Sequence, residues 1–379
     1  MSVGTLVLWA VAGLLLYIYI GYPGVIALVA RLWARPVHRG RPRLPLTLLI
    51  VAHNEAGRIG ARLENCLALR YDGPPPEILL GVDGASDGTA EAAAGYAGRV
   101  RLVRWRVRRG KAAVLNELIP RAHGEIVVLA DARQIFHRDA LRALVAPFAD
   151  PRVGAVSGEL VLRNHGGCAV GEGVGAYWRY EKWIRRNEAR IDSTVGVTGA
   201  IYAIRRRLFS PIPEDTILDD VLIPMKIARQ GYRVVFEPHA VAYDRAARSA
   251  SEEITRKVRT IAGNVQLFAR EPWLLHPLRN RLWIQTVSHK GLRLASPLLL
   301  GIAFTANLFL LDRPLYRLTF AAQVIFYLAA LAGASTRNAR RRLPLLSVPY
   351  AFCLLNWATV VAWLRFLTGT QRVTWERAS

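Results

Sequence analysis

The chain has 379 residues, of which 52% are hydrophobic, and its mean hydropathy of +0.20 is unusual for a purely soluble enzyme. That length accommodates one large domain or two ordinary ones. The formal net charge is +23, but the arginines are spread over every segment and form no patch interleaved with aromatic residues, so we expect no nucleic-acid partner. Cys66, Cys168 and Cys353 lie far apart without metal-ligand spacing, which predicts reduced thiols.

Four long segments carry no charge. The first covers residues 3–30, and three more cover 294–311, 318–336 and 343–364. A helix that crosses a membrane needs roughly 20 mostly apolar residues. The first run is too long for the apolar part of a signal peptide, lacks a basic start and shows no clear cleavage site. We therefore predict about four transmembrane helices, one N-terminal and three C-terminal.

Two basic clusters indicate an orientation. Residues 30–43 follow the first apolar run, and residues 336–342 separate the last two. Positive loops stay on the cytoplasmic side, where anionic lipid headgroups also attract them. We expect a multi-pass protein of the inner (cytoplasmic) membrane, with the middle of the chain facing the cytoplasm. In this orientation the residues after Leu364 would lie outside. They carry Arg365, Arg372 and Arg377, which goes against the rule that positively charged segments stay on the cytoplasmic side.

The middle of the chain alternates short apolar runs with amphipathic ones. Strands are predicted over 46–53, 77–84, 99–105 and 125–131, with helices over 56–69, 89–96 and 110–122 between them. Strands separated by helices of this length form a parallel sheet that is covered on both faces. The predicted fold class is α/β, with a mostly parallel sheet flanked by helices.

The segment 272–294 mixes Trp, Leu and Arg in a way that is typical of helices lying in the membrane interface. The predicted division of the chain is an N-terminal transmembrane helix (1–33), a catalytic domain (44–270), interfacial amphipathic helices (271–293), three transmembrane helices (294–367) and a tail (368–379).

Polar side chains follow three of the predicted strands. His53, Asn54 and Glu55 come after the first, Asp83 ends the second and Asp131 ends the fourth. Ligands of parallel sheets bind beyond the carboxyl ends of the strands. A structural role in a turn or as a helix N-cap could account for the polar residues after any one strand. It accounts less well for polar residues after all three strands.

Lys111 begins the helix that follows the third strand, where its charge opposes the helix dipole. A helix start tolerates lysine poorly unless an anion is nearby, and Gly110 lets the backbone approach such an anion. The pattern predicts a bound anion at this helix start.

Several motifs occur together in one order and spacing. They are VAHNE, VDGASDGT, RGKAAVLN and LADAR, extended by GVTGAIYAIRR (196–206) and by residues 216–238. Together they resemble the family 2 glycosyltransferases with a GT-A fold, over roughly residues 46–270. The flanking apolar runs resemble those of membrane-embedded members that make or extend polysaccharides and glycolipids.

The resemblance implies a site for a nucleotide diphosphate sugar. Asp83, with Asn54 and Glu55 nearby, would seat the uracil and ribose, and His53 would line the site. Lys111 would lie near the donor diphosphate.

Asp131 matches the first acid of the family's DxD motif, which contacts the donor diphosphate and a divalent metal. Mg²⁺ or Mn²⁺ is therefore the expected cofactor, held by few carboxylates and by the phosphates. Arg133 stands where the family usually has a second acid. Asp131 alone could hold the metal, Arg133 could bind phosphate through two hydrogen bonds, or Arg133 could turn outward and pair with a surface acid such as Asp139.

For the acceptor, Asp220 matches the general base that takes the proton of the attacking hydroxyl, with Asp219 beside it. Gly199 and Ala200 match positions where the family packs its backbone against the sugar and the acceptor. Tyr177 and Trp178, in an aromatic and basic helical segment at 169–191, could border the acceptor. Packing against the sheet is the alternative for at least two of the four aromatic rings there.

Processive members also carry a QxxRW signature. Here Arg259 matches its arginine, whereas Arg256 replaces glutamine and Thr260 replaces tryptophan. Both arginines are expected to contact the donor diphosphate; the alternative is a basic face on an amphipathic helix. An aromatic platform commonly holds a sugar ring, so its loss argues against long-chain processivity.

The predicted function is that of an inverting hexosyl- or N-acetylhexosaminyltransferase that uses a UDP-sugar and a membrane-associated glycan or lipid acceptor. The alternatives are a non-processive enzyme that adds one sugar to a lipid, and an inactive membrane protein that binds nucleotide sugars. Four spans are few for a self-contained polysaccharide channel, so a homo-oligomer or a polysaccharide-export partner could supply more.

Overall fold

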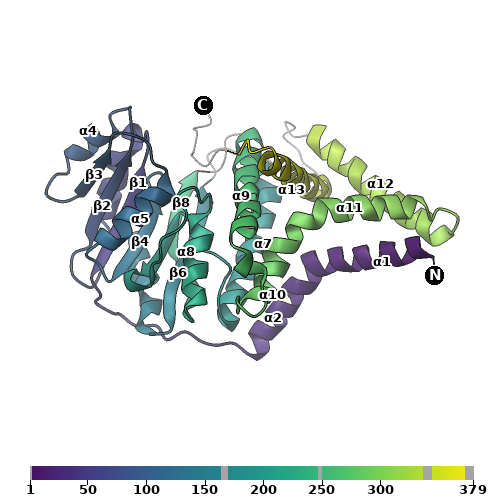
Figure 1. Ribbon diagram of the computed structural model, residues 1–379, viewed down its shortest axis with the longest axis horizontal. Coiled ribbons are helices and arrows are strands. Elements are labelled where there is room, and N and C mark those ends of the chain that lie inside the picture. The colour runs from purple at the N-terminus through teal and green to yellow at the C-terminus, as the bar shows by residue number, and fades with distance from the viewer. Residues whose placement is uncertain (1, 164–169, 246–249, 336–343, 372–379) are drawn as a thin grey trace.

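The computed structural model describes residues 2–163, 170–245, 250–335 and 344–371. A sheet with flanking helices forms one part, and long helices extend from one side of it (Figure 1). The basic cluster at 336–342, Cys168, Arg372 and Arg377 lie outside the described residues.

The sheet has eight strands among the described residues, in the order β3-β2-β1-β4-β7-β6-β8-β5. Their bounds are β1 Leu46–Ala52, β2 Glu77–Asp83, β3 Arg101–Trp105, β4 Ile126–Asp131, β5 Ile135–Phe136, β6 Val153–Arg163, β7 Ile201–Arg205 and β8 Arg233–Arg245. The first four strands are mutually parallel, as predicted. β7 runs antiparallel between β4 and β6, and β5 runs antiparallel to β8, so the sheet is mixed.

Helices cover both faces of the sheet. Their bounds are α3 Ala56–Leu67, α4 Thr89–Ala94, α5 Lys111–Arg121, α6 Ala140–Val145, α7 Val170–Ile191, α8 Asp219–Arg229 and α9 Ala250–Arg270. Successive strand residues point to opposite faces, and accordingly Leu48 and Ile50 of β1 pack with α3 and α6 while Leu49 packs with α5 and α8. The predicted covering of both faces is confirmed.

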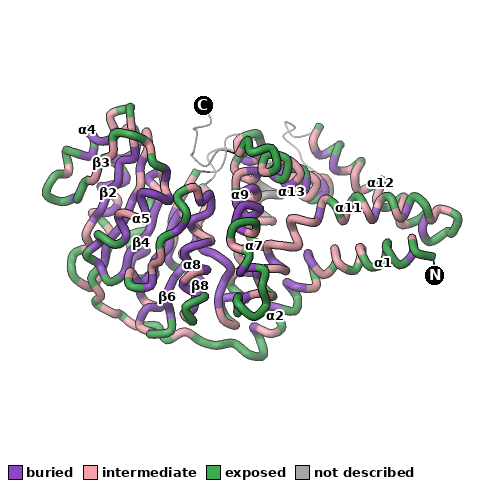
Figure 2. The backbone as a smooth tube through the Cα atoms, viewed as in Figure 1, coloured by how far each residue is buried: buried purple, intermediate pink, exposed green. Residues whose placement is uncertain are grey.

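Four helical segments are long and apolar enough to cross a membrane, one near the N-terminus and three near the C-terminus, which confirms that prediction. They are Val3–Leu32 (α1 Val3–Leu16, η1 Tyr17–Gly21, α2 Tyr22–Leu32), Trp283–Leu308 (α10 Trp283–Gln285, η5 Thr286–Gly291, α11 Leu292–Leu308), Pro314–Ser335 (α12) and Leu346–Leu367, within α13 Pro344–Leu367. Large apolar residues along them, such as Leu28, Leu298 and Leu318, are exposed. Figure 2 shows that long stretches of these helices are coloured as exposed or intermediate. Lipid is the solvent that accommodates such a surface.

The segment before the second span differs from the expected interfacial helices. Pro272–Leu275 forms a short 3₁₀ turn, and the next helix begins only at Trp283 and continues into the span. Pro272 and Pro277 oppose a longer helix, because proline lacks an N–H group and clashes with the preceding turn. Trp273 is instead buried in the core beneath the sheet.

Buried polar side chains join α7 to the first two spans. We call this set, which comprises Tyr22, Glu181, Glu188, His289 and Arg293, the junction network. The Tyr22 hydroxyl donates to Glu188 at 2.6 Å. His289 lies between Glu188, at 2.8 Å, and Glu181, at 3.0 Å, and Arg293 also pairs with Glu181. The network therefore holds the sheet domain against the membrane helices.

Candidate active site

The carboxyl ends of β1 and β2 are tied together by side chains that follow them. His53 Nδ1 lies 2.7 Å from the carbonyl oxygen of Asp83. Asn54 has a positive φ of 54° and accepts the Ser86 N–H through its side chain at 2.9 Å. This turn brings the residues expected around the donor base to one edge of the sheet.

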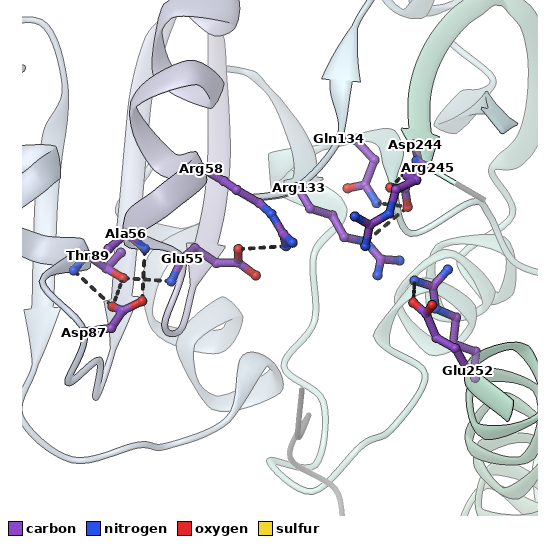
Figure 3. A network of polar contacts seen from close by, with 11 residues as sticks. Glu55, Ala56, Arg58, Asp87, Thr89, Arg133, Gln134, Asp244, Arg245 and Glu252 are labelled. Carbon is purple, nitrogen blue, oxygen red and sulfur yellow. Dashed lines mark hydrogen bonds and ion pairs between the residues drawn. The ribbon is translucent and has the colours of Figure 1, made fainter. Parts of the chain in front are cut away.

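Glu55 lies at the start of α3, where the loop after β2 comes close. Its backbone N–H donates to the Thr89 hydroxyl at 2.8 Å, and its side chain accepts from Arg58 at 3.3 Å. Asp87 accepts the N–H groups of Ala56 and Thr89, both at 3.1 Å, and so caps two helix starts at once (Figure 3). A contact between Glu55 and the donor stays a prediction.

Asp83 is buried and holds the loop that leads into α5. Its two carboxylate oxygens accept the backbone N–H groups of Arg109, at 2.7 Å, and Gly110, at 2.8 Å. Gly110 has a φ of 93°, a conformation that glycine adopts without strain. Asp83 therefore positions the first residue of α5, Lys111, and its contact with the donor base stays a prediction.

Lys111 links the ends of two other elements. Its Nζ atom lies 3.1 Å from Asp131, the last residue of β4, and 3.2 Å from Asp219, the first residue of α8. Burial alone would lower the pKa of Lys111, but Asp131 and the acids of α8 raise it. The anion that the sequence predicts at this helix start is thus supplied, in part, by the protein's own carboxylates.

Asp220 follows Asp219 and faces the β7 side of the site. The Gly199 N–H donates to its carboxylate at 3.1 Å, and a Cβ atom added at Gly199 would lie 2.8 Å from the same oxygen. Burial and the neighbouring charge of Asp219 raise the pKa of Asp220 to about 6. Such a carboxyl is suited to accept a proton near neutral pH. Ala200 is buried, and its contact with an acceptor stays a prediction.

Arg133 makes an ion pair that the sequence does not predict. It lies 3.1 Å from Asp244 of β8, which also accepts from Gln134 at 2.9 Å (Figure 3). The alternative pairing of Arg133 with Asp139 is wrong: Arg133 pairs with Asp244, and Asp139 pairs with Arg142 at 3.4 Å and with Arg70 at 3.7 Å. Burial alone would raise the pKa of Asp131, but Lys111 and Arg133 lower it.

The two arginines of α9 have different surroundings. Burial lowers the pKa of Arg259, while the charges of Asp219, Asp220 and Asp131 oppose that effect. Arg259 is partly buried and within electrostatic reach of these three acids, and its contact with a donor diphosphate stays a prediction. Arg256 pairs with Glu252 one turn earlier in the helix.

Tyr177 and Trp178 lie where α7 meets α9. The Lys257 Nζ atom is 4.8 Å from the centroid of each ring. Tyr180 instead packs toward the first span and donates to the Tyr19 carbonyl at 2.7 Å. Contacts of the first two rings with an acceptor stay predictions.

Sequence analysis misses Arg185 of α7. Its Nη1 donates to the Thr198 hydroxyl at 3.1 Å, next to Gly199, and its charge acts on Asp220. The sequence could have pointed to Arg185 through helical spacing. Tyr177, Glu181 and Arg185 follow one another at intervals of four residues, so they share one face of the helix.

A divalent metal fits this arrangement only together with the donor. Among the described residues no group of three His, Cys, Asp or Glu side chains could hold one. Asp131 offers one carboxylate, and its neighbours Lys111 and Arg133 are cations. Mg²⁺ is commonly bound by one or two carboxylates plus substrate phosphates, so Asp131 and the phosphates of a bound donor would hold the ion jointly.

The profile of the glycosyltransferase-like family 2 matches residues 42–263. The chain belongs to that family. Poly-β-1,6-N-acetyl-D-glucosamine synthases are similar to it: that of Staphylococcus aureus (strain MSSA476) is 27% identical over 234 residues, 60% of this chain and 56% of the relative. That of Staphylococcus epidermidis is 25% identical over the same shares. The chain thus matches little more than half the length of these relatives.

A solved structure supports the fold. The mannosyltransferase PcManGT from Pyrobaculum calidifontis, in complex with GDP-Man and Mn²⁺, superposes with a TM-score of 0.71 at 24% identity, over 95% of this chain and 99% of that one. The predicted family and the GT-A type of fold, with its membrane helices, are confirmed.

Replacing Gly199 with alanine should displace the Asp220 carboxylate, because the new methyl group would lie 2.8 Å from it. A shift of about 1 Å in a reacting group costs about 100-fold in rate. We expect kcat for sugar transfer to fall by that order. Gly57→Ala is the matched control, since nothing lies within 4 Å of its Cβ position. Equal kcat values for the two variants would contradict this placement of Asp220.

Proposed function

We propose that this glycosyltransferase is an inverting enzyme that moves a sugar from a UDP-sugar to a membrane-associated glycan or lipid. The observation that carries the proposal is the charge cluster in which Lys111 contacts Asp131 and Asp219, directly beside Asp220. A cation that could neutralise a diphosphate therefore lies next to a carboxyl whose pKa is raised to about 6.

The cations would stabilise the leaving group. When the bond between the anomeric carbon and the diphosphate breaks, its electron pair moves to a phosphate oxygen. Lys111 and Arg259 can neutralise that developing charge, and Arg133 acts on the same acid cluster. Preorganised charges of this kind are often the largest contribution to catalysis. Mg²⁺ or Mn²⁺, held by Asp131 with the phosphates, would add positive charge at the same place.

Asp220 would act on the acceptor. The acceptor hydroxyl oxygen attacks the anomeric carbon opposite the leaving diphosphate, and its proton passes to the Asp220 carboxylate. A single displacement of this kind turns an α-linked donor into a β-glycoside. The Gly199 N–H holds the carboxylate in place at 3.1 Å.

Thr260 favours a second candidate, the addition of a single sugar to a lipid. It occupies the position where processive members have tryptophan, and its hydroxyl donates to the Arg256 carbonyl at 3.0 Å. A threonine offers no flat apolar face to a sugar ring. Longer products would require another platform, a homo-oligomer or an export partner.

The four candidate spans support an inner-membrane location. With the N-terminus outside, the catalytic domain, residues 44–270, faces the cytoplasm, where nucleotide sugars are made. The basic segment at 30–43 lies on the same side in this arrangement.

Donor turnover tests the proposal. The full chain in lipid nanodiscs, with a membrane-lipid extract as acceptor, should consume one of UDP-glucose, UDP-N-acetylglucosamine, UDP-galactose or GDP-mannose and form a β-linked product. Asp220→Asn should reduce kcat roughly 100- to 10,000-fold, whereas the surface variant Asp139→Asn should not. Turnover that survives in Asp220→Asn, or an α-linked product, would overturn the inverting mechanism.

The pH profile should report Asp220. Only the ionised carboxylate accepts a proton, and its pKa is raised to about 6. We expect kcat/KM to be constant above this value and to fall about tenfold per pH unit below it. A profile that stays flat well below pH 6 would rule out Asp220 as the base.

Metal removal should abolish transfer, because the anionic Asp131 carboxylate would repel the donor phosphates unless a divalent cation lay between them. We expect loss of activity in excess chelator and recovery with Mn²⁺ or Mg²⁺, and weak recovery in Asp131→Asn. Full activity in excess chelator would show that Lys111, Arg133 and Arg259 suffice without a metal.

A further inference from the structure

Arg185 of α7 is a half-buried cation with few contacts. Among the described residues it forms no ion pair, and its one hydrogen bond is to the Thr198 hydroxyl, at 3.1 Å. Its Nε atom is buried and has no hydrogen-bond partner within the same residues. Removing a charge from water without pairing it is costly, so the placement of Arg185 requires an explanation.

Packing alone does not explain it, as a comparison with Arg205 of β7 shows. The buried Arg205 side chain donates to the carbonyl oxygens of Val153, at 2.9 Å, and Phe148, at 2.8 Å. It also pairs with Glu125 at 3.2 Å. Arg205 therefore joins several chain segments and is neutralised by an acid, whereas Arg185 contacts a single neutral hydroxyl.

That hydroxyl belongs to a turn that holds Asp220 by its backbone and by its side chain. The Val197 N–H donates to the Asp220 carbonyl oxygen at 2.8 Å, and the Gly199 N–H donates to the carboxylate at 3.1 Å. Thr198 lies between these two donors in the chain. Arg185 thus contacts the middle one of three consecutive residues that hold the general base.

The same turn is also tied to the sheet. The Thr198 N–H donates to the Ser157 hydroxyl of β6 at 2.9 Å. Ser157 fixes the backbone of the turn from one element, and Arg185 fixes its side chain from another, α7. Loss of Arg185 would leave the turn attached to the sheet but not to this helix, so that Asp220 could shift.

Charged and titratable groups from several elements act on Asp220 or are acted on by it. They are Lys111 of α5, Asp131 of β4, Arg185 of α7, Tyr202 of β7, Asp219 of α8 and Arg259 of α9. Burial and Asp219 raise the pKa of Asp220, whereas Lys111 and Arg185 lower it.

The two cations that lower this pKa are not equivalent. Lys111 is already shared by Asp131 and Asp219, at 3.1 and 3.2 Å, and a bound diphosphate would draw on its charge as well. Arg185 has no acid of its own among the described residues. Its charge therefore stays available to Asp220 when the donor is bound.

We propose that Arg185 is a positioning residue for sugar transfer, which holds the turn at Thr198 and thereby orients the Asp220 carboxylate toward the acceptor hydroxyl. Its positive charge also favours the ionised form of the base, which is the form that accepts the proton. This inference rests on the proposed function, in which Asp220 is the general base.

The pH dependence of kcat/KM for two Arg185 variants tests the effect of the charge, with the full chain in nanodiscs and the donor-turnover assay given above. The wild type should lose rate below about pH 6. Arg185→Met should move this midpoint to higher pH by about one unit, because a favourable charge is lost. It should also lower kcat on the plateau at least about tenfold, because the base shifts. Arg185→Lys keeps the charge and should keep the wild-type midpoint.

Thr198→Val tests the contact without changing any charge. It removes the hydroxyl that accepts from Arg185, so kcat on the plateau should fall about tenfold while the midpoint stays in place. Arg179→Met is the matched control, since this arginine is exposed on the same helix, and it should match the wild type in both quantities. UDP affinity verifies that each variant is folded.

Infrared titration of the carboxyl band that Asp220→Asn removes gives the Asp220 midpoint without turnover. A merely structural Arg185 would leave this midpoint unchanged in Arg185→Met, and that result would overturn the inference. So would a wild-type plateau in Thr198→Val, which decides the matter if Arg185→Met does not fold. A band that shifts in Arg185→Met while the wild-type rate stays flat with pH would contradict only the proposed function.

Discussion

The arrangement of the site depends on one half-buried cation, Lys111. It lies between Asp131 at the end of β4 and Asp219 at the start of α8, at 3.1 and 3.2 Å. Without it, these carboxylates and Asp220 would repel one another in a partly buried region. Asp83 fixes the backbone just before Lys111 through two hydrogen bonds. Two acids from distant parts of the chain are thereby brought to one cation, which a bound diphosphate can share.

Much of this arrangement can be predicted from sequence. Local patterns determine β1 to β4 and the four apolar spans, and motif similarity brings Asp131 and Asp220 to one site. The antiparallel β7 between β4 and β6 could not be predicted, because strand pairing over such separations leaves no local pattern. The pairing of Arg133 with Asp244 was missed for the same reason, since the two residues are 111 positions apart in the sequence.

The membrane helices do more than anchor the enzyme. Tyr22 and His289 come from two spans, and both contact Glu188 of α7, the helix that also carries Arg185. Buried hydrogen bonds to charged groups are among the stronger polar interactions in proteins. One helix, α7, thus connects two candidate membrane spans with the residues around Asp220.

Affinity for UDP tests the central role of Lys111 most directly. It should be measured by calorimetry, at one Mn²⁺ concentration, for the wild type, Lys111→Met and the control Lys226→Met of α8. If the donor diphosphate shares the cation that holds Asp131 and Asp219, Lys111→Met should bind UDP at least about tenfold more weakly, while the control should match the wild type. Unchanged UDP affinity in a folded Lys111→Met protein would contradict the account.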